Sequence, residues 1–138
     1  MNDNETYTGS CLCGALRYEA SGEPAYAGYC YCGDCRKASG SGFFPFMGFP
    51  ASALRIEGET RKFAARSARG GDAVRNTCVV CGSLVFGGEL GEDDWHTIYA
   101  GSLDDPSRFR PTAAILTRNR PAWAVIPPNL KVFEGMPS

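Results

Sequence analysis

The sequence predicts an all-β domain built from short strands with little helix, and three observations lead to this prediction. Its 138 residues include 17 Gly and 9 Pro, a composition that indicates many turns. Short segments alternate apolar and polar residues at the two-residue period of a half-buried strand. No segment keeps a 3.6-residue apolar period over three turns, so a long amphipathic helix is not expected. The length fits one domain and no linker or repeat divides the chain, so we expect a single domain over residues 1–138.

In the first half of the chain, strands are expected at residues 7–11, 15–20 and 23–29. Residues 33–39 predict one short helical turn, with Asp34 near its start and the breaker run Gly40-Ser41-Gly42 after it. An aromatic segment, 43–46, follows this turn. Because proline cannot donate a hydrogen bond to a β-ladder, Pro45 predicts an edge strand or an irregular strand there.

The second half continues the pattern of short strands separated by turns. Strands are expected at residues 54–57, 60–66, 73–77, 83–87, 95–100, 112–117 and 122–126. The expected strands at 73–77 and 83–87 flank a second cysteine-containing turn, which resembles the one that separates 7–11 from 15–20. Two similar turns in an all-β chain suggest that they hold the strands together.

The charge of the chain excludes two classes of partner. The formal net charge is -1, so no general attraction to nucleic acid or to an anionic membrane is expected. No apolar segment approaches the roughly 20 residues that a membrane helix needs. The first residues, Met1 to Glu5, are acidic and polar rather than basic and apolar, so a signal peptide is not expected. We therefore expect a cytoplasmic protein, and the sequence leaves its oligomeric state open.

The seven cysteines are the strongest chemical signal. They form a CxC, a CxCxxC and a CxxC group, at Cys11-Leu12-Cys13, Cys30-Tyr31-Cys32-Gly33-Asp34-Cys35 and Cys78-Val79-Val80-Cys81. An odd number of cysteines without an export signal disfavours disulfides and favours metal ligands or redox groups. A tight turn with two thiols can direct both at one zinc ion, and the glycines that follow, Gly14 and Gly82, permit a left-handed turn.

The preferred division gives two Zn2+ ions per chain. Cys11, Cys13, Cys78 and Cys81 would form a closed four-thiolate structural site, whose binding energy contributes to folding. The remaining group, which we call the cysteine triple, consists of Cys30, Cys32 and Cys35. Three protein ligands with an open fourth position are typical of a catalytic zinc site.

Several alternatives remain open at this point. His96, the single histidine of the sequence, can close the cysteine triple as a fourth ligand, or it can simply be a strand residue beside Trp95. Cys32 and Cys35 can form a redox dithiol, and all three thiols of the triple can be packed as free side chains. Cys30 and Cys32 can also join Cys78 and Cys81, a pairing that leaves the first two cysteines without a role.

The order of these groups resembles the glutathione-dependent formaldehyde-activating enzyme family, which includes the related centromere protein V. The resemblance extends from about residue 9 to about residue 133 and includes further segments, namely Gly9-Ser10, Cys35-Arg36-Lys37, Ala100-Gly101-Ser102-Leu103-Asp104-Asp105-Pro106 and Arg120-Pro121-Ala122-Trp123. It implies an all-β fold of the Mss type, a structural zinc on Cys11, Cys13, Cys78 and Cys81, and a second zinc on the cysteine triple. Residue 31 is Tyr where family members often carry His.

The resemblance also implies an activity, the formation of S-hydroxymethylglutathione from formaldehyde and glutathione, which is a carbon–sulfur lyase reaction in reverse. A free thiol has a pKa near 8.5, and coordination to zinc deprotonates it, so a thiol at the open position would be ready to attack a carbonyl carbon. Asp34, Tyr31 and His96 are the candidates for proton transfer. The expected partners are a small-molecule thiol such as glutathione and a small aldehyde, and the alternative function is a non-catalytic, zinc-stapled protein-binding module.

Two further groups of residues have a structural and a functional interpretation. The aromatic residues Phe43, Phe44, Phe46 and Phe49 are expected in the core or on the wall of a pocket over the second zinc, and Trp123 in the core or as a lid. The basic residues Arg61, Lys62, Arg66, Arg69 and Arg75 are expected on a solvated strand face, with an anion or carboxylate site as the alternative. An open cysteine triple beside a pocket favours the enzyme, whereas closure by His96 favours the binding module.

Overall fold

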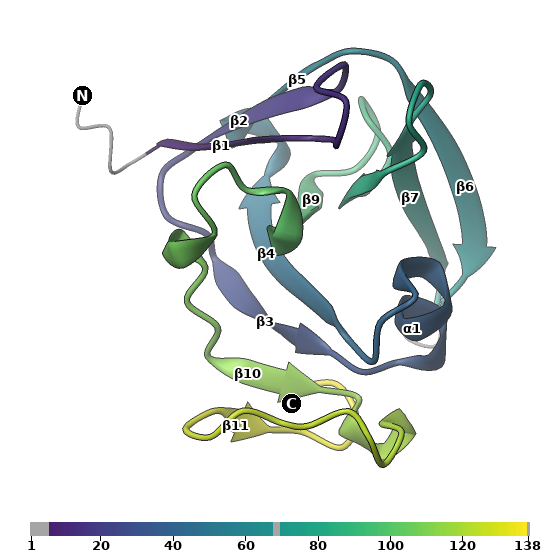
Figure 1. Cartoon of the computed structure of the whole chain (residues 1–138), viewed down its shortest axis with the longest axis vertical. Coiled ribbons are helices and arrows are strands. Elements are labelled where there is room, and N and C mark those ends of the chain that lie inside the picture. The colour runs from purple at the N-terminus through teal and green to yellow at the C-terminus, as the bar shows by residue number, and fades with distance from the viewer. Residues whose placement is uncertain (1–5, 68–69, 138) are drawn as a thin grey trace.

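A computed structural model describes residues 6–67 and 70–137, and it is mostly β, as predicted, with a single α-helix in the described part of the chain (Figure 1). The strands are β1 (Thr6–Ser10), β2 (Arg17–Ser21), β3 (Tyr26–Cys30), β4 (Phe44–Pro50), β5 (Leu54–Glu57), β6 (Thr60–Arg66), β7 (Asp72–Cys78), β8 (Leu84–Gly87), β9 (Trp95–Tyr99), β10 (Ala113–Ile115) and β11 (Lys131–Val132). The helix is α1 (Gly33–Ser39), and short 3-10 helices lie at Ala51–Ala53, Ala100–Ser102, Pro106–Arg108 and Thr117–Asn119. Arg69 and the segment Met1 to Glu5 lie outside the described residues.

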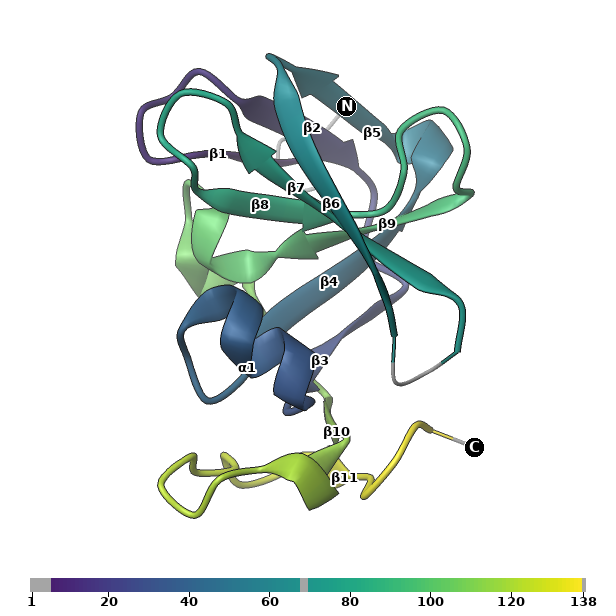
Figure 2. The same cartoon turned by 90° about the vertical axis from the view of Figure 1, so that its right-hand side faces the viewer.

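The strands form two sheets. Strands β1, β2 and β5 make a three-stranded antiparallel sheet. The other sheet has eight strands in the order β11-β10-β3-β4-β9-β8-β7-β6. Its ladders are antiparallel except where β10 pairs with β3 and with β11, both in parallel. This sheet is strongly twisted, so β6 crosses the direction of β4, and β10 and β11 lie at the end of the molecule far from β1 and β2 (Figures 1 and 2).

The two faces of the central strands have different surroundings. On one face, Met47 of β4 and Ile98 of β9 belong to the main hydrophobic core, which also includes Tyr7 and Leu16 from the N-terminal part of the chain. Side chains alternate between the faces of a strand. The residues between the core residues, such as Phe46 and Tyr99, therefore point to the opposite face, where the candidate site lies. The described residues include no helix that has the length and apolar character needed to cross a membrane.

The helix α1 begins and ends at the residues that the sequence predicts. Cys32 is its N-cap, and the Cys32 sulfur accepts a hydrogen bond from the Cys35 N–H. Gly40 ends the helix with a φ of 71°, a left-handed conformation that glycine adopts without a steric penalty. The helix therefore holds two cysteines of the triple in one turn.

Two of the strand predictions are wrong. Pro45 predicts an edge strand or an irregular strand, but β4 is a continuous strand that lies between β3 and β9. The ladder with β9 begins only at Phe46, so Pro45 lies one residue outside that ladder and its missing N–H breaks no bond there. Residues 122–126 form a turn and an irregular segment instead of a strand. Pro121 precedes this segment and Pro127 follows it, and both lack an N–H for a ladder.

Candidate metal centres and the pocket beside them

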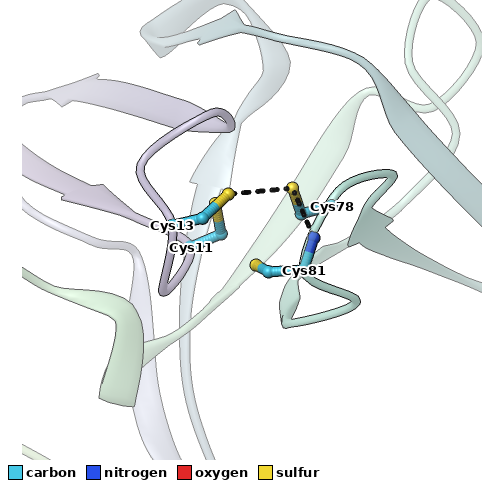
Figure 3. Close-up of side chains that lie close together, drawn as sticks. All are labelled: Cys11, Cys13, Cys78 and Cys81. Carbon is cyan, nitrogen blue, oxygen red and sulfur yellow. Dashed lines mark hydrogen bonds between the residues drawn. The ribbon is translucent and has the colours of Figure 1, made fainter.

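Four thiols from two distant turns meet at one point. Cys11 and Cys13 lie in the turn between β1 and β2, and Cys78 and Cys81 lie where β7 turns into β8 (Figure 3). The Cys13 sulfur is 3.6 Å from that of Cys11 and 3.7 Å from that of Cys78. Zinc–sulfur bonds of 2.3 Å in a tetrahedron place sulfur atoms about 3.8 Å apart. The four-cysteine cluster therefore has the dimensions of a tetrahedral zinc site.

The local backbone of both turns suits this role. Gly14 and Gly82, which follow the second cysteine of each pair, have φ values of 84° and 76°. The Cys11 sulfur accepts a hydrogen bond from the Leu16 N–H at 3.3 Å, a contact that stabilises a thiolate. An all-sulfur donor set with such N–H contacts fits zinc.

The second pair of this cluster is stabilised in the form that binds metal. The Cys81 sulfur and the Ser83 hydroxyl oxygen are 3.2 Å apart. Hydrogen bonds from the side chain and backbone of Ser83 lower the pKa of the Cys81 thiol to about 5. The Cys78 sulfur accepts the Val80 N–H at 3.3 Å. The turn therefore favours the thiolate form of Cys81 at neutral pH.

The cysteine triple forms a second, separate cluster. Cys30 ends β3, while Cys32 and Cys35 lie at the start of α1. The Cys35 sulfur is 2.9 Å from that of Cys32 and 3.3 Å from that of Cys30. Both distances exceed the bonded length of about 2.05 Å in a disulfide, and both are shorter than a zinc tetrahedron edge by less than about 1 Å. A small outward movement of the thiols would therefore let the triple hold a zinc ion.

The three thiols of the triple shift one another's pKa values. Side-chain hydrogen bonds with Cys30 and Cys35 lower the pKa of Cys32 to about 2. The interaction with Cys32 raises the pKa of Cys30 to about 11, and the thiols of Cys30 and Cys32 also raise the pKa of Cys35. Because metal ligands must be thiolates, binding of zinc here would release protons from Cys30 and Cys35.

A pocket of about 570 Å³ opens beside the triple, with Cys30 and Cys35 in its wall. This volume lies within the usual range of small-molecule sites, about 300–1,000 Å³. Next to these sulfurs the rings of Phe44 and Tyr99 are stacked, with centroids 4.1 Å apart and planes inclined by 5°. Tyr26 and Trp95 continue the aromatic wall. The cysteine triple is therefore joined to a pocket that has one aromatic wall, whereas the four-cysteine cluster does not line this pocket.

The residues proposed from the sequence for proton transfer do not line this pocket. Tyr31 is fully buried, and its hydroxyl donates to the Val125 carbonyl at 2.9 Å. Asp34 is exposed in the first turn of α1. His96 is buried on the core face, where Nδ1 lies 3.2 Å from the Gly87 carbonyl and the ring contacts Phe86 edge-on. His96 is thus absent from the cysteine triple, which leaves the triple as three thiols alone.

The aromatic residues after the triple divide between two places. Phe44 and Phe46 line the pocket, whereas Phe49 is buried in the main core against Tyr7 and Phe43 packs on Tyr29. The expectation that Trp123 is a core residue is wrong. Trp123 is 69% exposed, because the proline-flanked segment that carries it stays outside the sheets, and it is not among the residues that line the pocket.

Arg75 is a polar residue of the pocket, although the sequence favours a solvated strand face for it. Arg75 belongs to the basic residues expected on a solvated face, yet it is only partly exposed and lines the pocket. Its neighbour Asn76 is buried, and the Asn76 side-chain amide donates to the Gly88 carbonyl at 2.8 Å. Neighbouring residues of a strand point to opposite faces of the sheet, so the Arg75 side chain lies on the face opposite to that of Asn76. A buried residue beside an arginine in a predicted strand is the sequence signal for this placement.

Removal of metal should distinguish the two clusters. We expect two zinc ions per chain in protein purified without chelator and supplied with zinc. A mild chromophoric chelator should remove them in two phases, the zinc of the triple first, because that site opens into a pocket and has three ligands instead of four. The measurement is the time course of chelator absorbance. Loss of both ions in one phase would contradict the division into a closed and an open site.

Comparisons with known proteins show the family and the fold of this chain. The profile of the family described as glutathione-dependent formaldehyde-activating enzyme matches residues 6–119. A crystal structure of a Rhodobacter sphaeroides protein matches with a TM-score of 0.52 and 22% identity, over 70% of this chain and 87% of that one, which shows a shared fold. A search of curated proteins found no significant match. The matched range includes both cysteine clusters, and the chain belongs to the glutathione-dependent formaldehyde-activating enzyme family.

Proposed function

We propose that this protein is a zinc-dependent enzyme of the carbon–sulfur lyase type, which forms or cleaves the adduct of glutathione with a small aldehyde such as formaldehyde. One observation carries the proposal: Cys30 and Cys35 line a pocket of about 570 Å³, and no histidine closes their cluster. A site with a free ligand position and an adjoining pocket can receive a substrate thiol. Family membership supports glutathione and formaldehyde as the reactants.

The proposed roles of the two clusters differ. Cys11, Cys13, Cys78 and Cys81 would hold a structural zinc that joins the β1–β2 and β7–β8 turns, while Cys30, Cys32 and Cys35 would hold the second zinc as the catalytic site. When bound there, zinc would favour the thiolate form of a substrate thiol. Three thiolates already give the site a net negative charge, which favours thiol exchange over activation of water.

The proposed reaction is an addition. The thiolate sulfur of glutathione attacks the carbonyl carbon of formaldehyde, so a carbon–sulfur bond forms. The electron pair of the carbonyl π bond moves to oxygen, which then takes up a proton and gives the hydroxymethyl group. The reverse direction cleaves the carbon–sulfur bond and returns the aldehyde and the thiol.

The pocket walls would bind and shield the reactants. Phe44 and Ile115 pack against the cysteine triple and line the pocket. Such a surface excludes water from the thiolate side, which strengthens the electrostatic interactions of the bound groups. Tyr99, stacked on Phe44, brings a hydroxyl group to the same wall.

The proposal includes a single domain over residues 1–138 and a cytoplasmic location. One core connects residues from Tyr7 to Leu103, which supports a single unit. All seven cysteines are free thiols, a state that suits a reducing compartment. A net charge of -1, which two zinc ions and seven thiolates would change to -4 (-1 - 7 + 4), supports a small-molecule partner over nucleic acid.

A spectroscopic experiment tests thiol binding at the triple. In cobalt-substituted protein, glutathione should change the sulfur-to-cobalt charge-transfer bands, because its thiolate adds a ligand. S-methylglutathione, a thioether without an ionisable thiol, should leave the bands unchanged. Equal responses to the two compounds would contradict binding through the thiol.

A further inference from the structure

Strand β6 forms a long, exposed edge of the eight-stranded sheet. It is the last strand of this sheet and pairs only with β7, so it lies on the outside of the molecule (Figure 1). Five of its seven residues are exposed and none is buried. The ladder with β7 runs through all seven residues without a bulge, and β6 contains no proline. An edge of this kind is a template on which a further strand can pair.

The other sheet edges are short or already paired. At the opposite side of the same sheet, β11 has only two residues, and the edge strand β5 has four. The free side of β1 is bonded to the chain that follows β9, because the Asp104 N–H donates to the Thr8 carbonyl at 2.9 Å and Gly9 forms a bridge with Leu103. Within the described residues, β6 is therefore the long edge that the chain does not pair with itself.

The hydrogen-bonding groups at this edge belong to alternate residues. The Val74 carbonyl accepts the Gly88 N–H at 2.9 Å, so Val74 directs its backbone groups to β8. Ala64 is the partner of Val74 on β6, and in an antiparallel ladder such a residue directs its N–H and C=O away from β7. Every second residue repeats this direction. The outward-directed residues of β6 are Thr60, Lys62, Ala64 and Arg66.

A second copy of β6 fits this edge in antiparallel orientation. Two identical strands related by a twofold axis at Phe63 form hydrogen-bonded pairs between outward-directed residues. Lys62 then lies opposite Ala64 of the partner subunit, and Thr60 lies opposite Arg66 of the partner subunit. All seven residues of β6 are paired in this register. The ring of Phe63, which is 69% exposed, then lies beside the partner's Phe63, an aromatic cross-strand pair that favours the contact.

The positions of the charges favour this register over its neighbours. Charged side chains usually protect a sheet edge, because like charges that lie opposite each other destabilise the pairing. With the axis at Phe63, every cation of β6 lies opposite an alanine or a threonine. With the axis at Lys62, two lysines would lie opposite each other, and with the axis at Ala64, lysine would lie opposite arginine. The ion pair of Lys62 with Glu89, at 2.5 Å, also lowers the positive charge of the edge.

We propose that this protein forms a twofold-symmetric dimer through antiparallel pairing of β6 with β6 of a second copy, in the register centred on Phe63. The two eight-stranded sheets would then join into one continuous sheet. Phe63 pairs with Arg75 across the ladder, and Arg75 lines the pocket, so the two Phe63 rings lie on the pocket face of this sheet. No cysteine belongs to β6, and the dimer does not depend on the proposed function.

Sedimentation equilibrium of the full-length, zinc-loaded protein tests the dimer. The mass of wild type should rise with concentration toward twice the 14.8 kDa of one chain. Ala64→Pro removes an N–H that points away from β7, so the fold and the zinc content should persist. The dimer should be weakened at least about 10-fold, because each subunit loses a hydrogen bond to the other. A wild type that stays monomeric up to about 1 mM, or a folded Ala64→Pro that dimerises as wild type does, would overturn the proposal.

Charges at position 64 test the register without a change in the backbone. In the proposed register this position lies opposite Lys62 of the partner subunit, and the contact occurs twice. Ala64→Lys should therefore weaken the dimer about 3- to 30-fold, and Ala64→Glu should strengthen it by a similar factor. Ala122→Lys is the matched control, because it adds the same charge at an exposed alanine outside the sheets, and it should dimerise as wild type does. Equal dimerisation of all three variants would contradict the pairing of β6.

A double variant separates the register from a general effect of net charge. Lys62→Glu combined with Ala64→Glu makes β6 less positive, but in the proposed register it places two carboxylates opposite each other. We expect this variant to form a weaker dimer than Ala64→Glu alone. If net charge alone controlled the association, the double variant would form the tighter dimer, and this result would overturn the register centred on Phe63.

Discussion

Replacing Cys81 by serine is expected to leave the protein largely unfolded or insoluble. The four-cysteine cluster joins two turns whose thiols, Cys13 and Cys78, are 65 residues apart in the sequence. A hydroxyl is a poor zinc ligand, so Cys81→Ser weakens the site. Structural zinc contributes about 10–16 kcal/mol in small zinc peptides, while a whole domain has a stability of about 5–15 kcal/mol. Loss of part of the zinc-binding free energy is therefore enough to remove most of the free energy of unfolding of the domain.

Circular dichroism, thermal unfolding and zinc content measure this effect. Ser83→Ala is the matched control, because it removes the hydroxyl beside the Cys81 sulfur and keeps all four thiols. We expect the control to fold and to retain two zinc ions. A cooperative transition at the wild-type temperature in Cys81→Ser would contradict a structural role for this cluster.

Replacing Cys32 by serine should have the opposite outcome, a folded protein with one zinc ion fewer. The three thiols of the triple lie within six residues, so loss of this metal frees no long loop and costs little loop-closure entropy. Cys32 is also the N-cap of α1, where its sulfur accepts the Cys35 N–H. Serine is among the preferred N-cap residues, so the start of the helix should persist.

The comparison of Cys32→Ser with Cys81→Ser separates the two clusters. Zinc content should fall from two ions to one in Cys32→Ser, with a thermal unfolding temperature near that of wild type. If Cys32→Ser unfolds as badly as Cys81→Ser, the triple is structural, and the enzyme proposal fails with it.

Elements defined by local patterns could be predicted from the sequence. Strand β6 alternates its side chains and follows Gly58 and Glu59, and its predicted and observed bounds agree. The same holds for α1, because Gly40 ends it through its own backbone conformation. The cysteine pairs could also be placed in turns, since each pair and its following glycine form a local unit.

Features that depend on distant pairing could not be predicted. Whether Pro45 disrupts a strand depends on which residue of β9 lies opposite, and the local sequence does not reveal this. The strand β11 has only two residues and exists through its parallel pairing with β10. Residues 122–126 have the composition of a strand, but they have no partner strand in the structure.

The residues that line the pocket also depend on distant pairing and could not be predicted from the sequence alone. Tyr31 and Asp34 are close to the cysteine triple in the sequence but do not line the pocket, because Tyr31 packs on the far side of β3 and Asp34 faces solvent. Arg75 is distant in the sequence and lines it, because β7 lies in the same sheet as β3. Sheet register decides which basic residue of the segment from Arg61 to Arg75 lines the pocket, and a single sequence does not provide this register.

The exchange of 13C-labelled formaldehyde with S-hydroxymethylglutathione, measured by two-dimensional exchange NMR, tests directly whether the cysteine triple is an active site. We expect wild-type protein to increase the exchange rate well above the uncatalysed value. We expect folded Cys32→Ser, with its structural zinc retained, to leave the rate at the uncatalysed value. Equal rates with wild type, with Cys32→Ser and without protein would contradict the assignment of the cysteine triple and its pocket as an active site.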